Sequence, residues 1–333
     1  MTPHRLVAHF GSLRTTLVCM ALLALAVLAG QVIAPLLGVL LTVALAALGV
    51  NLLAALVVHP AFRRQLPLLV AHLALLVLVV LVALSQLVSL DGRFELTQGV
   101  PFDGALLDAR SGALHRSDLA PLALRHDGFE IAYAPGRKRG ATRNTVHWRD
   151  GDGQPHSAVI GDHRPLVVEG FRIYTSPNKG FAPLLTWRPA HGRPTTGSVH
   201  LPSYPMHELK QSREWSLPDG REVWVQLQFD ENLIDPAAPA RFRLPGEHRL
   251  VVRTASQRAE LAPGAAIELP GGTLVYEGLR SWMGYRVTRD PTLPWLLAAA
   301  LLTAFGFAWH YVAAFRSAPQ QAPRAALQGA GDA

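Results

Sequence analysis

The chain has 333 residues, of which 50% are hydrophobic and 17% charged, and its mean hydropathy is +0.20. This balance is too apolar for an ordinary soluble domain and too polar for a chain that lies wholly in a membrane. The formal net charge is +7, but residues 91–290 contain 25 Lys and Arg against 23 Asp and Glu. The positive excess therefore lies mainly in the flanks, and it does not indicate binding to nucleic acid.

Long stretches without Asp, Glu, Lys or Arg mark candidate membrane spans. They cover residues 15–62, 65–90 and 291–315. A bilayer core about 30 Å thick needs about 20 apolar residues as a helix, so the first stretch accommodates two spans, with Gln31 and Pro35 at the turn. A cleaved signal peptide is the alternative for the first span, but its apolar run continues and favours an uncleaved hairpin. We predict four transmembrane helices, at residues 13–33, 36–58, 66–90 and 293–315.

The basic residues beside these spans predict the orientation. They lie before the first span, between the second and third, and after the fourth: Arg5, Arg14, Arg63, Arg64, Arg316 and Arg324. Short basic loops stay in the cytoplasm, so both termini are predicted to be cytoplasmic and residues 91–290 extracytoplasmic. The expected location is the cell membrane, with several passes. The tail at residues 317–333 has low complexity and is predicted to be disordered and cytoplasmic.

The segment between the third and fourth spans is long enough to bury its own core. It is rich in Gly and Pro, and several stretches alternate apolar and polar residues as strands do. We predict strands at residues 129–135, 166–176, 222–229, 248–254, 272–278 and 284–290, separated by turns at "SPNKG", "LPDG" and "LPGG". The fold class is thus four transmembrane helices plus an antiparallel, β-rich, sandwich-like domain. The predicted divisions are residues 1–90, 91–290, 291–316 and 317–333.

The motifs of common enzymes are missing from the sequence. Cys19 is the only cysteine, so the chain has no Cys-x-x-Cys pair for thiol chemistry and no Cys-x-x-Cys-His motif of a c-type cytochrome. No Gly-x-Ser-x-Gly, phosphate loop or His-Glu-x-x-His occurs either. Nine histidines of the outer segment show no tight metal spacing and are interpreted as solvated surface residues. We therefore predict neither catalytic residues nor a metal site in the chain.

Two histidines inside the predicted spans are the functional candidates. His72 lies about six residues into the third span, and His310 precedes Arg316 by six residues in the fourth. An ionisable side chain within a span is costly and suggests a function. Such an imidazole either forms a hydrogen bond across helices or binds the iron of haem, whose flat apolar ring suits a span. The face of His72 carries Leu68, Leu69, Leu75, Leu76 and Val79, with Ala71 and Ala74 leaving room beside the ring.

Several segments resemble the ResB (CcsB) family of System II cytochrome c biogenesis proteins. They are "FGSLRTTLVCMALLALAVLAG" near the start, "VNLLAALVVHP" and "AHLALLVLVVLVALSQL" in the next two spans, "VVEGFRIYTSPNKGFAPLLTW" in the outer segment, and "YEGLRSWMGYRVTRDPTLPWLLAAALLTAFGFAWHYV". The resemblance covers residues 10–315, approximately. The "SLRTT" start, the histidine of the third span and "GYRVTRDP" are its most specific parts.

The resemblance implies a function and partners. ResB-like proteins act with a polytopic ResC (CcsA) type protein to carry haem across the membrane and attach it to apocytochrome c. It implies that His72 is an axial ligand of haem b and that the partner supplies the second ligand, with His310 as a candidate further contact. Because the Trp-rich haem-presenting segment belongs to the partner, this chain is not expected to be an enzyme by itself. The alternative is a membrane-tethered scaffold or sensor, without haem, whose outer domain binds a peptide or an envelope partner.

Overall fold

The structure is a computed structural model that describes residues 3–32 and 37–317. The predicted turn around Pro35 and the predicted disordered tail beyond Ser317 lie outside these residues. The chain divides into two compact units. The membrane unit comprises Met1–Val88, Gly112–Leu114 and Pro291–Ala333, and the outer unit comprises Ser89–Ser111 and His115–Asp290.

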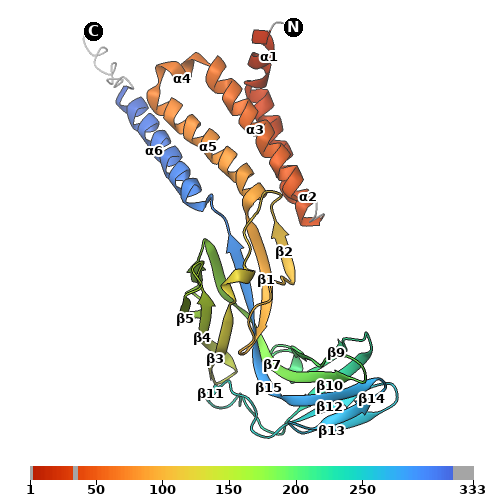
Figure 1. Cartoon of the computed structure of the whole chain (residues 1–333). Helices are drawn as coiled ribbons and strands as arrows, with labels where there is room; N and C mark the ends of the chain where they lie inside the picture. The colour runs from red at the N-terminus through yellow and green to blue at the C-terminus, as the bar shows by residue number, and fades with distance from the viewer. Residues whose placement is uncertain (1–2, 33–36, 318–333) are drawn as a thin grey trace, which may run out of the picture. The chain divides into compact units, whose positions relative to one another are not determined.

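The membrane unit is helical, and four of its helices are long and apolar enough to cross a membrane (Figure 1). The α-helices within the described residues are α1 (Pro3–Phe10), α2 (Leu13–Val32), α3 (Leu37–Val58), α4 (Pro60–Arg64), α5 (Leu66–Val88) and α6 (Leu293–Ser317). The four predicted spans are therefore confirmed as helices. Helix α5 ends two residues before the predicted end of the third span, because Leu90 already begins a strand.

Small residues bring the membrane helices into close contact. A Cβ atom added to Gly306 on α6 would lie 2.8 Å from Cα of Ala71 on α5, and one on Gly11 would lie 2.8 Å from the backbone nitrogen of Ala55 on α3. Such approach maximises van der Waals contact, which is the main attraction between helices in lipid. A small apolar cluster of Leu45 and Val79, among others, joins α3 to α5.

The "SLRTT" segment has a structural role where α1 ends and α2 begins. Asn51 of α3, 1% exposed, donates from Nδ2 to the carbonyl oxygen of Phe10 at 2.5 Å and accepts from Oγ1 of Thr16 at 2.8 Å. Nε2 of His59 donates to the carbonyl of Gly11 at 3.0 Å. These side chains bind backbone groups that the break between the helices leaves without helical partners.

The outer unit is built of antiparallel strands in three sheets, so the predicted fold class is confirmed (Figure 1). Its strands are β1 (Leu90–Thr97), β2 (Asp108–Ser111), β3 (Arg125–Ala134), β4 (Lys138–Arg149), β5 (Pro155–Gly161), β6 (Leu166–Val168), β7 (Phe171–Pro189), β8 (Thr195–Ser198), β9 (Ser212–Ser216), β10 (Glu222–Gln228), β11 (Ala240–Arg241), β12 (Arg249–Arg253), β13 (Arg258–Leu261), β14 (Ala266–Leu269) and β15 (Gly272–Arg289). The sheet orders are β2-β1-β15-β7-β6, β13-β12-β10-β9 and β11-β3-β4-β5, with β14 paired to β15 and β8 to β7.

Two hydrophobic cores share the long strands β7 and β15. One core contains Phe94, Phe171 and Tyr285 and includes residues of β3, β4 and β5. The other contains Phe181 and Tyr276 and includes residues of β10 and β12. Because β7 and β15 are paired along most of their length, each contributes residues to both cores.

The strand predictions need three corrections. Residues 272–278 and 284–290, predicted as separate strands, form the single strand β15. The predicted turn "SPNKG" lies inside β7, where residues 176–178 bulge out opposite Gly284 and the ladder then continues at Lys179. A bulge needs the same small and polar residues as a turn, so composition alone does not separate them.

The third correction concerns residues 166–176, which form two strands instead of one. Strands β6 and β7 pair as a hairpin, with Val168 opposite Phe171. The two residues between them, Glu169 and Gly170, have φ of 48° and 79°. Positive φ at both central residues is the requirement of a tight two-residue hairpin turn, and glycine meets it without strain.

Candidate functional site

His72 lies on α5 between two aromatic side chains of neighbouring helices. The centroid of its ring is 4.7 Å from that of Phe62 on α4 and 5.6 Å from that of Phe307 on α6. The ring is half-buried. These contacts place the imidazole in an apolar setting where few groups compete for its nitrogen atoms.

The hydrogen bond of His72 determines which nitrogen is free. Nδ1 is 2.9 Å from the carbonyl oxygen of Leu68, one turn earlier in the same helix. A carbonyl oxygen only accepts, so Nδ1 carries the proton, and in the neutral ring Nε2 keeps its lone pair. Among the described residues Nε2 forms no hydrogen bond, and this atom is not fully buried. Metal-binding histidines are commonly held in this way by a carbonyl on the opposite nitrogen.

The room that sequence analysis expected beside Ala71 is filled. The backbone of α6 at Gly306 packs directly on Ala71, and Ala74 is also buried. The open side of α5 is instead the one that carries Leu73 and Val77, which are 51% and 46% exposed. The closest backbone approach between α5 and α6 is thus made by small residues next to His72, while the imidazole contacts α6 through the ring of Phe307.

His310 lies on the face of α6 that packs against α5. It follows Gly306 by four residues, which is about one helical turn, and it is half-buried. Its ring centroid is 5.7 Å from that of Tyr311. Across residues 3–32 and 37–317, no cluster of three or more His, Cys, Asp or Glu side chains is arranged to hold a metal ion. A role of His310 toward haem stays a prediction.

The interpretation of the outer histidines as solvated surface residues is wrong for His126. Its side chain is fully buried, with Nε2 donating to the carbonyl of Leu96 at 3.1 Å and Nδ1 accepting from the amide of Gly128 at 3.1 Å. Burial lowers the pKa of His126 below its ordinary value, so the ring is neutral at pH 7. A sequence signal existed, since Leu122, Leu124 and His126 alternate with other residues in the way of an inward-facing strand.

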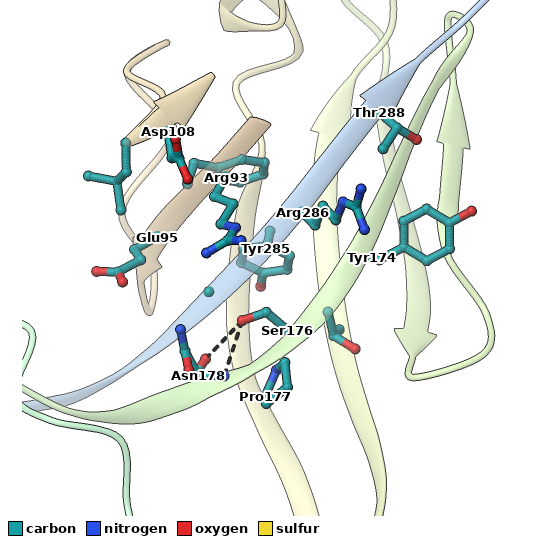
Figure 2. Close-up of a pocket in the computed structure, with 14 residues that line it drawn as sticks. Arg93, Glu95, Asp108, Tyr174, Ser176, Pro177, Asn178, Tyr285, Arg286 and Thr288 are labelled. Atoms are coloured by element: carbon teal, nitrogen blue, oxygen red, sulfur yellow. Dashed lines mark hydrogen bonds between the residues drawn. The ribbon is translucent and has the colours of Figure 1, made fainter. Parts of the chain in front are cut away.

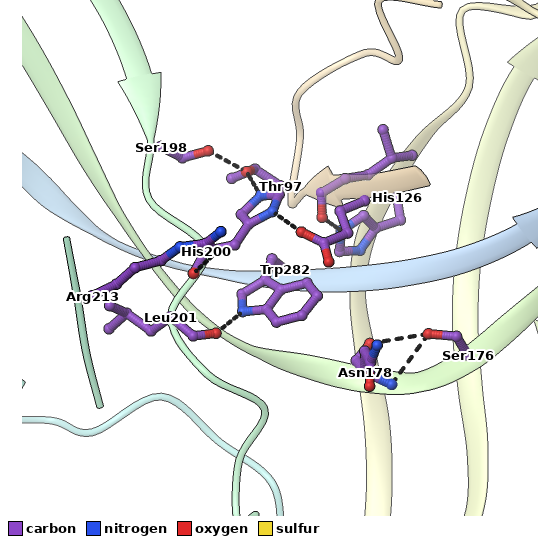
Figure 3. Close-up of polar contacts among 11 residues, drawn as sticks. Thr97, His126, Ser176, Asn178, Ser198, His200, Leu201, Arg213 and Trp282 are labelled. Atoms are coloured by element: carbon purple, nitrogen blue, oxygen red, sulfur yellow. Dashed lines mark hydrogen bonds and ion pairs between the residues drawn. The ribbon is translucent and has the colours of Figure 1, made fainter. Parts of the chain in front are cut away.

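His200 is likewise part of a polar cluster in the outer unit (Figure 3). Its Nδ1 is 2.7 Å from Oε2 of Glu95, and its Nε2 is 2.8 Å from Oγ1 of Thr97, which also contacts Ser198. The ring stacks on Trp282 with centroids 5.0 Å apart. This cluster could not be predicted from the sequence, because Glu95 and His200 are 105 residues apart.

The order hydroxyl, imidazole, carboxylate is also that of nucleophilic catalysis. However, Thr97 is only 4% exposed and its hydroxyl is already bonded. Trp282 covers one face of the imidazole and donates from Nε1 to the carbonyl of Leu201 at 2.9 Å. The cluster therefore serves to fix the segment after β8 to strand β1.

A groove of about 780 Å³ crosses the outer face of strands β1, β15 and β7 (Figure 2). The charged and polar side chains of its wall include Arg93, Glu95, Asp108, Tyr174, Asn178 and Arg286. The signal for its first strand was present in "DGRFELT", where charged residues alternate with buried Phe94 and Leu96. Sequence analysis missed that strand because it begins directly after the third span.

The fold defines the class: a multi-span membrane protein with a β-rich domain between its third and fourth long helices. The model of the ResB-like family matches residues 61–223, from α4 to the start of β10. This match supports the resemblance to the ResB-like family, a family associated with cytochrome c biogenesis. No curated protein matches the chain.

Proposed function

We propose that this chain is the ResB-like subunit of a membrane complex that transports haem and supports its covalent attachment to apocytochrome c. The observation that carries the proposal is the state of His72. A carbonyl of its own helix holds Nδ1, while Nε2 keeps an unpaired lone pair in an apolar setting. An imidazole in that state is suited to be an axial ligand of haem iron.

The competing explanation for an intramembrane histidine is a hydrogen bond between helices. The partner of His72 is Leu68, four residues earlier, so this bond joins no second helix. Helices α5 and α6 instead meet through Ala71 and Gly306. Packing alone therefore gives no reason for the cost of placing an imidazole there.

The rest of the proposal concerns orientation and partners. Basic residues such as Arg14, Arg63 and Arg316 flank the spans on one side, which supports cytoplasmic termini and an extracytoplasmic outer unit. Haem b is cargo that binds transiently. A ResC-type partner supplies the second iron ligand and the haem-presenting segment, and apocytochrome c is the acceptor. The chain then contributes capture and support, and not catalysis by itself.

Haem content tests the proposal. The full chain is co-expressed with a ResC-type partner and purified, and its haem b is measured by absorbance of the reduced pyridine complex. His72→Ala should lose most of the haem, whereas His59→Ala, whose Nε2 bonds to Gly11, serves as a control in the same unit. Added imidazole should restore haem to His72→Gly. An unchanged Soret band in His72→Ala would favour the haem-free scaffold or sensor.

A further inference from the structure

The groove on the outer face of the outer unit places cations in one row across three strands. Arg93 on β1 lies directly opposite Arg286 on β15, which lies opposite Tyr174 on β7. On the other side, Arg93 is opposite Asp108 of β2. Figure 2 shows Arg93 and Arg286 on the same face of the sheet. Like charges directly opposite each other in a sheet are destabilising unless an anion lies between them.

One of these two cations is already paired. Asp91 binds Arg286, with Nε to Oδ1 at 3.0 Å and Nη2 to Oδ2 at 2.6 Å. This bond holds the pKa of Asp91 below its ordinary value, and the charges of Arg110 and Arg93 lower it further. The carboxylate of Asp91 is thus committed to Arg286.

Arg93 is the cation that stays available. Its side chain is exposed, and within the described residues its guanidinium has neither a hydrogen bond nor an ion pair, although Asp108 lies opposite. Two carboxylates line the groove: Glu95 is bound by His200, and Asp108 forms no ion pair with Arg93 in the described part of the chain. A free guanidinium presents a planar fork of donors that matches a carboxylate in two parallel bonds.

The shape of the groove suits a small organic ligand. Its volume of about 780 Å³ lies within the range of known small-molecule sites. The bulge of β7 places Ser176 and Asn178 at one end, where they add hydroxyl and amide groups. The side chains of Phe94 and Tyr285 are buried in the core beneath the charged row, so the aromatic surface of the groove is that of half-buried Tyr174. The arrangement combines hydrogen-bond donors with aromatic surface.

We propose that this groove binds the carboxylate group of an organic anion through Arg93, with Arg286 as the neighbouring cation. Two classes of molecule carry such a carboxylate group: a porphyrin with its two carboxylates, and a free dicarboxylate. The porphyrin source rests on the proposed function, because haem is then the cargo of this chain. The groove would hold the carboxylate edge of that cargo independently of the iron ligand His72.

The test uses metal-free protoporphyrin IX, which carries the carboxylates but no iron. Its fluorescence is titrated with the full chain in nanodiscs of neutral lipid, against empty nanodiscs. Protoporphyrin IX should bind, and its dimethyl ester should bind at least tenfold more weakly. Arg93→Gln should weaken binding of the acid about tenfold, the effect of losing one charge-assisted bond. Arg172→Gln should leave binding unchanged, since Arg172 faces outward on β7 but does not line the groove.

Succinate distinguishes the two sources. Direct binding of succinate, measured by calorimetry and dependent on Arg93, with no porphyrin binding would support the site and assign it to a free dicarboxylate. Equal binding of acid and ester, an unaffected Arg93→Gln variant and no binding of succinate would together overturn the proposal. Since the probe holds no iron, this result is independent of the haem content of His72→Ala.

Discussion

The membrane unit and the outer unit differ in the kind of packing that stabilises each of them internally. In the outer unit, large side chains such as Phe181 and Tyr276 are wholly buried, and the charged residues other than Lys179 lie outside the buried core. In the membrane unit, most large apolar side chains face outward, and helices meet at Gly11 and Gly306. Water drives large side chains inward in one unit, whereas lipid gives no such drive in the other, where close backbone approach decides.

The largest expected effect comes from opening a cavity in the outer unit. Phe181 is 0% exposed and packs against Phe242 and Tyr204. Phe181→Ala should lower the free energy of unfolding by about 4 kcal/mol. Val167→Ala, at a residue 63% exposed, should change it by less than about 0.5 kcal/mol. Denaturant unfolding of the full chain followed by tryptophan fluorescence measures both, and equal effects would refute this account of the core.

The converse change adds a side chain to the membrane unit. Gly306→Leu should destabilise the α5–α6 contact by about 3 kcal/mol, because even a Cβ would lie 2.8 Å from Cα of Ala71. The matched control is Gly38→Leu, where a Cβ meets nothing within 4 Å. Thermal aggregation of the detergent-solubilised chain should begin at a lower temperature only for Gly306→Leu. An unchanged onset temperature of aggregation in Gly306→Leu would show that α5 and α6 tolerate a wider separation.

A smaller effect is expected from the polar contact between α3 and the start of α2. Asn51→Leu keeps a side chain of similar size but removes the hydrogen bonds of Asn51 to the carbonyl of Phe10 and the hydroxyl of Thr16. The cost should be about 1 to 2 kcal/mol. Cys19, buried in α2, reports on this region through its labelling rate with a maleimide. Faster labelling in Asn51→Leu is expected, and an unchanged rate would deny Asn51 a role in docking α2.

The smallest effect is a pH dependence in the outer unit. Burial, with repulsion from Arg139, lowers the pKa of Lys179 from 10.5 to about 8, while Asp162 opposes the shift. The unfolded chain keeps this proton up to higher pH, so stability rises with pH once the folded lysine is deprotonated. From pH 7 to 9 the gain should be about 1 kcal/mol.

The comparison for this pH dependence is Lys179→Met, which retains the unbranched chain that packs beside Thr142. Denaturant unfolding at pH 7, 8 and 9 should show a rise in stability for the natural chain and a flatter profile for Lys179→Met. Parallel profiles would mean that Lys179 is solvated in solution.

The two units also differ in how well the sequence predicts them. Charge-free runs give the spans within two residues at α5, since lipid tolerates few charges. Alternation gives strands such as β10, but it does not reveal that β15 continues through Gly278 and Gly284. Pairings such as Glu95 with His200 depend on which distant strands meet, and a single sequence holds no local signal for that.

The candidate site shows the same division. The position of His72 within an apolar run was readable, because an imidazole stands out there. That its Nδ1 bonds to Leu68 follows from side-chain rotation about the helix, which the sequence does not specify. The sequence also did not predict that the guanidinium of Arg93 is unpaired, because this depends on Asp91 binding Arg286.

Strands β7 and β15 have a consequence for the cooperativity of the outer unit. Since each strand contributes to both hydrophobic cores, losing one core would remove two paired strands from the other. Neither half is therefore an independent folding module, and proteolysis should yield no stable half-fragment. The outer unit should unfold in one cooperative transition, despite its two hydrophobic cores.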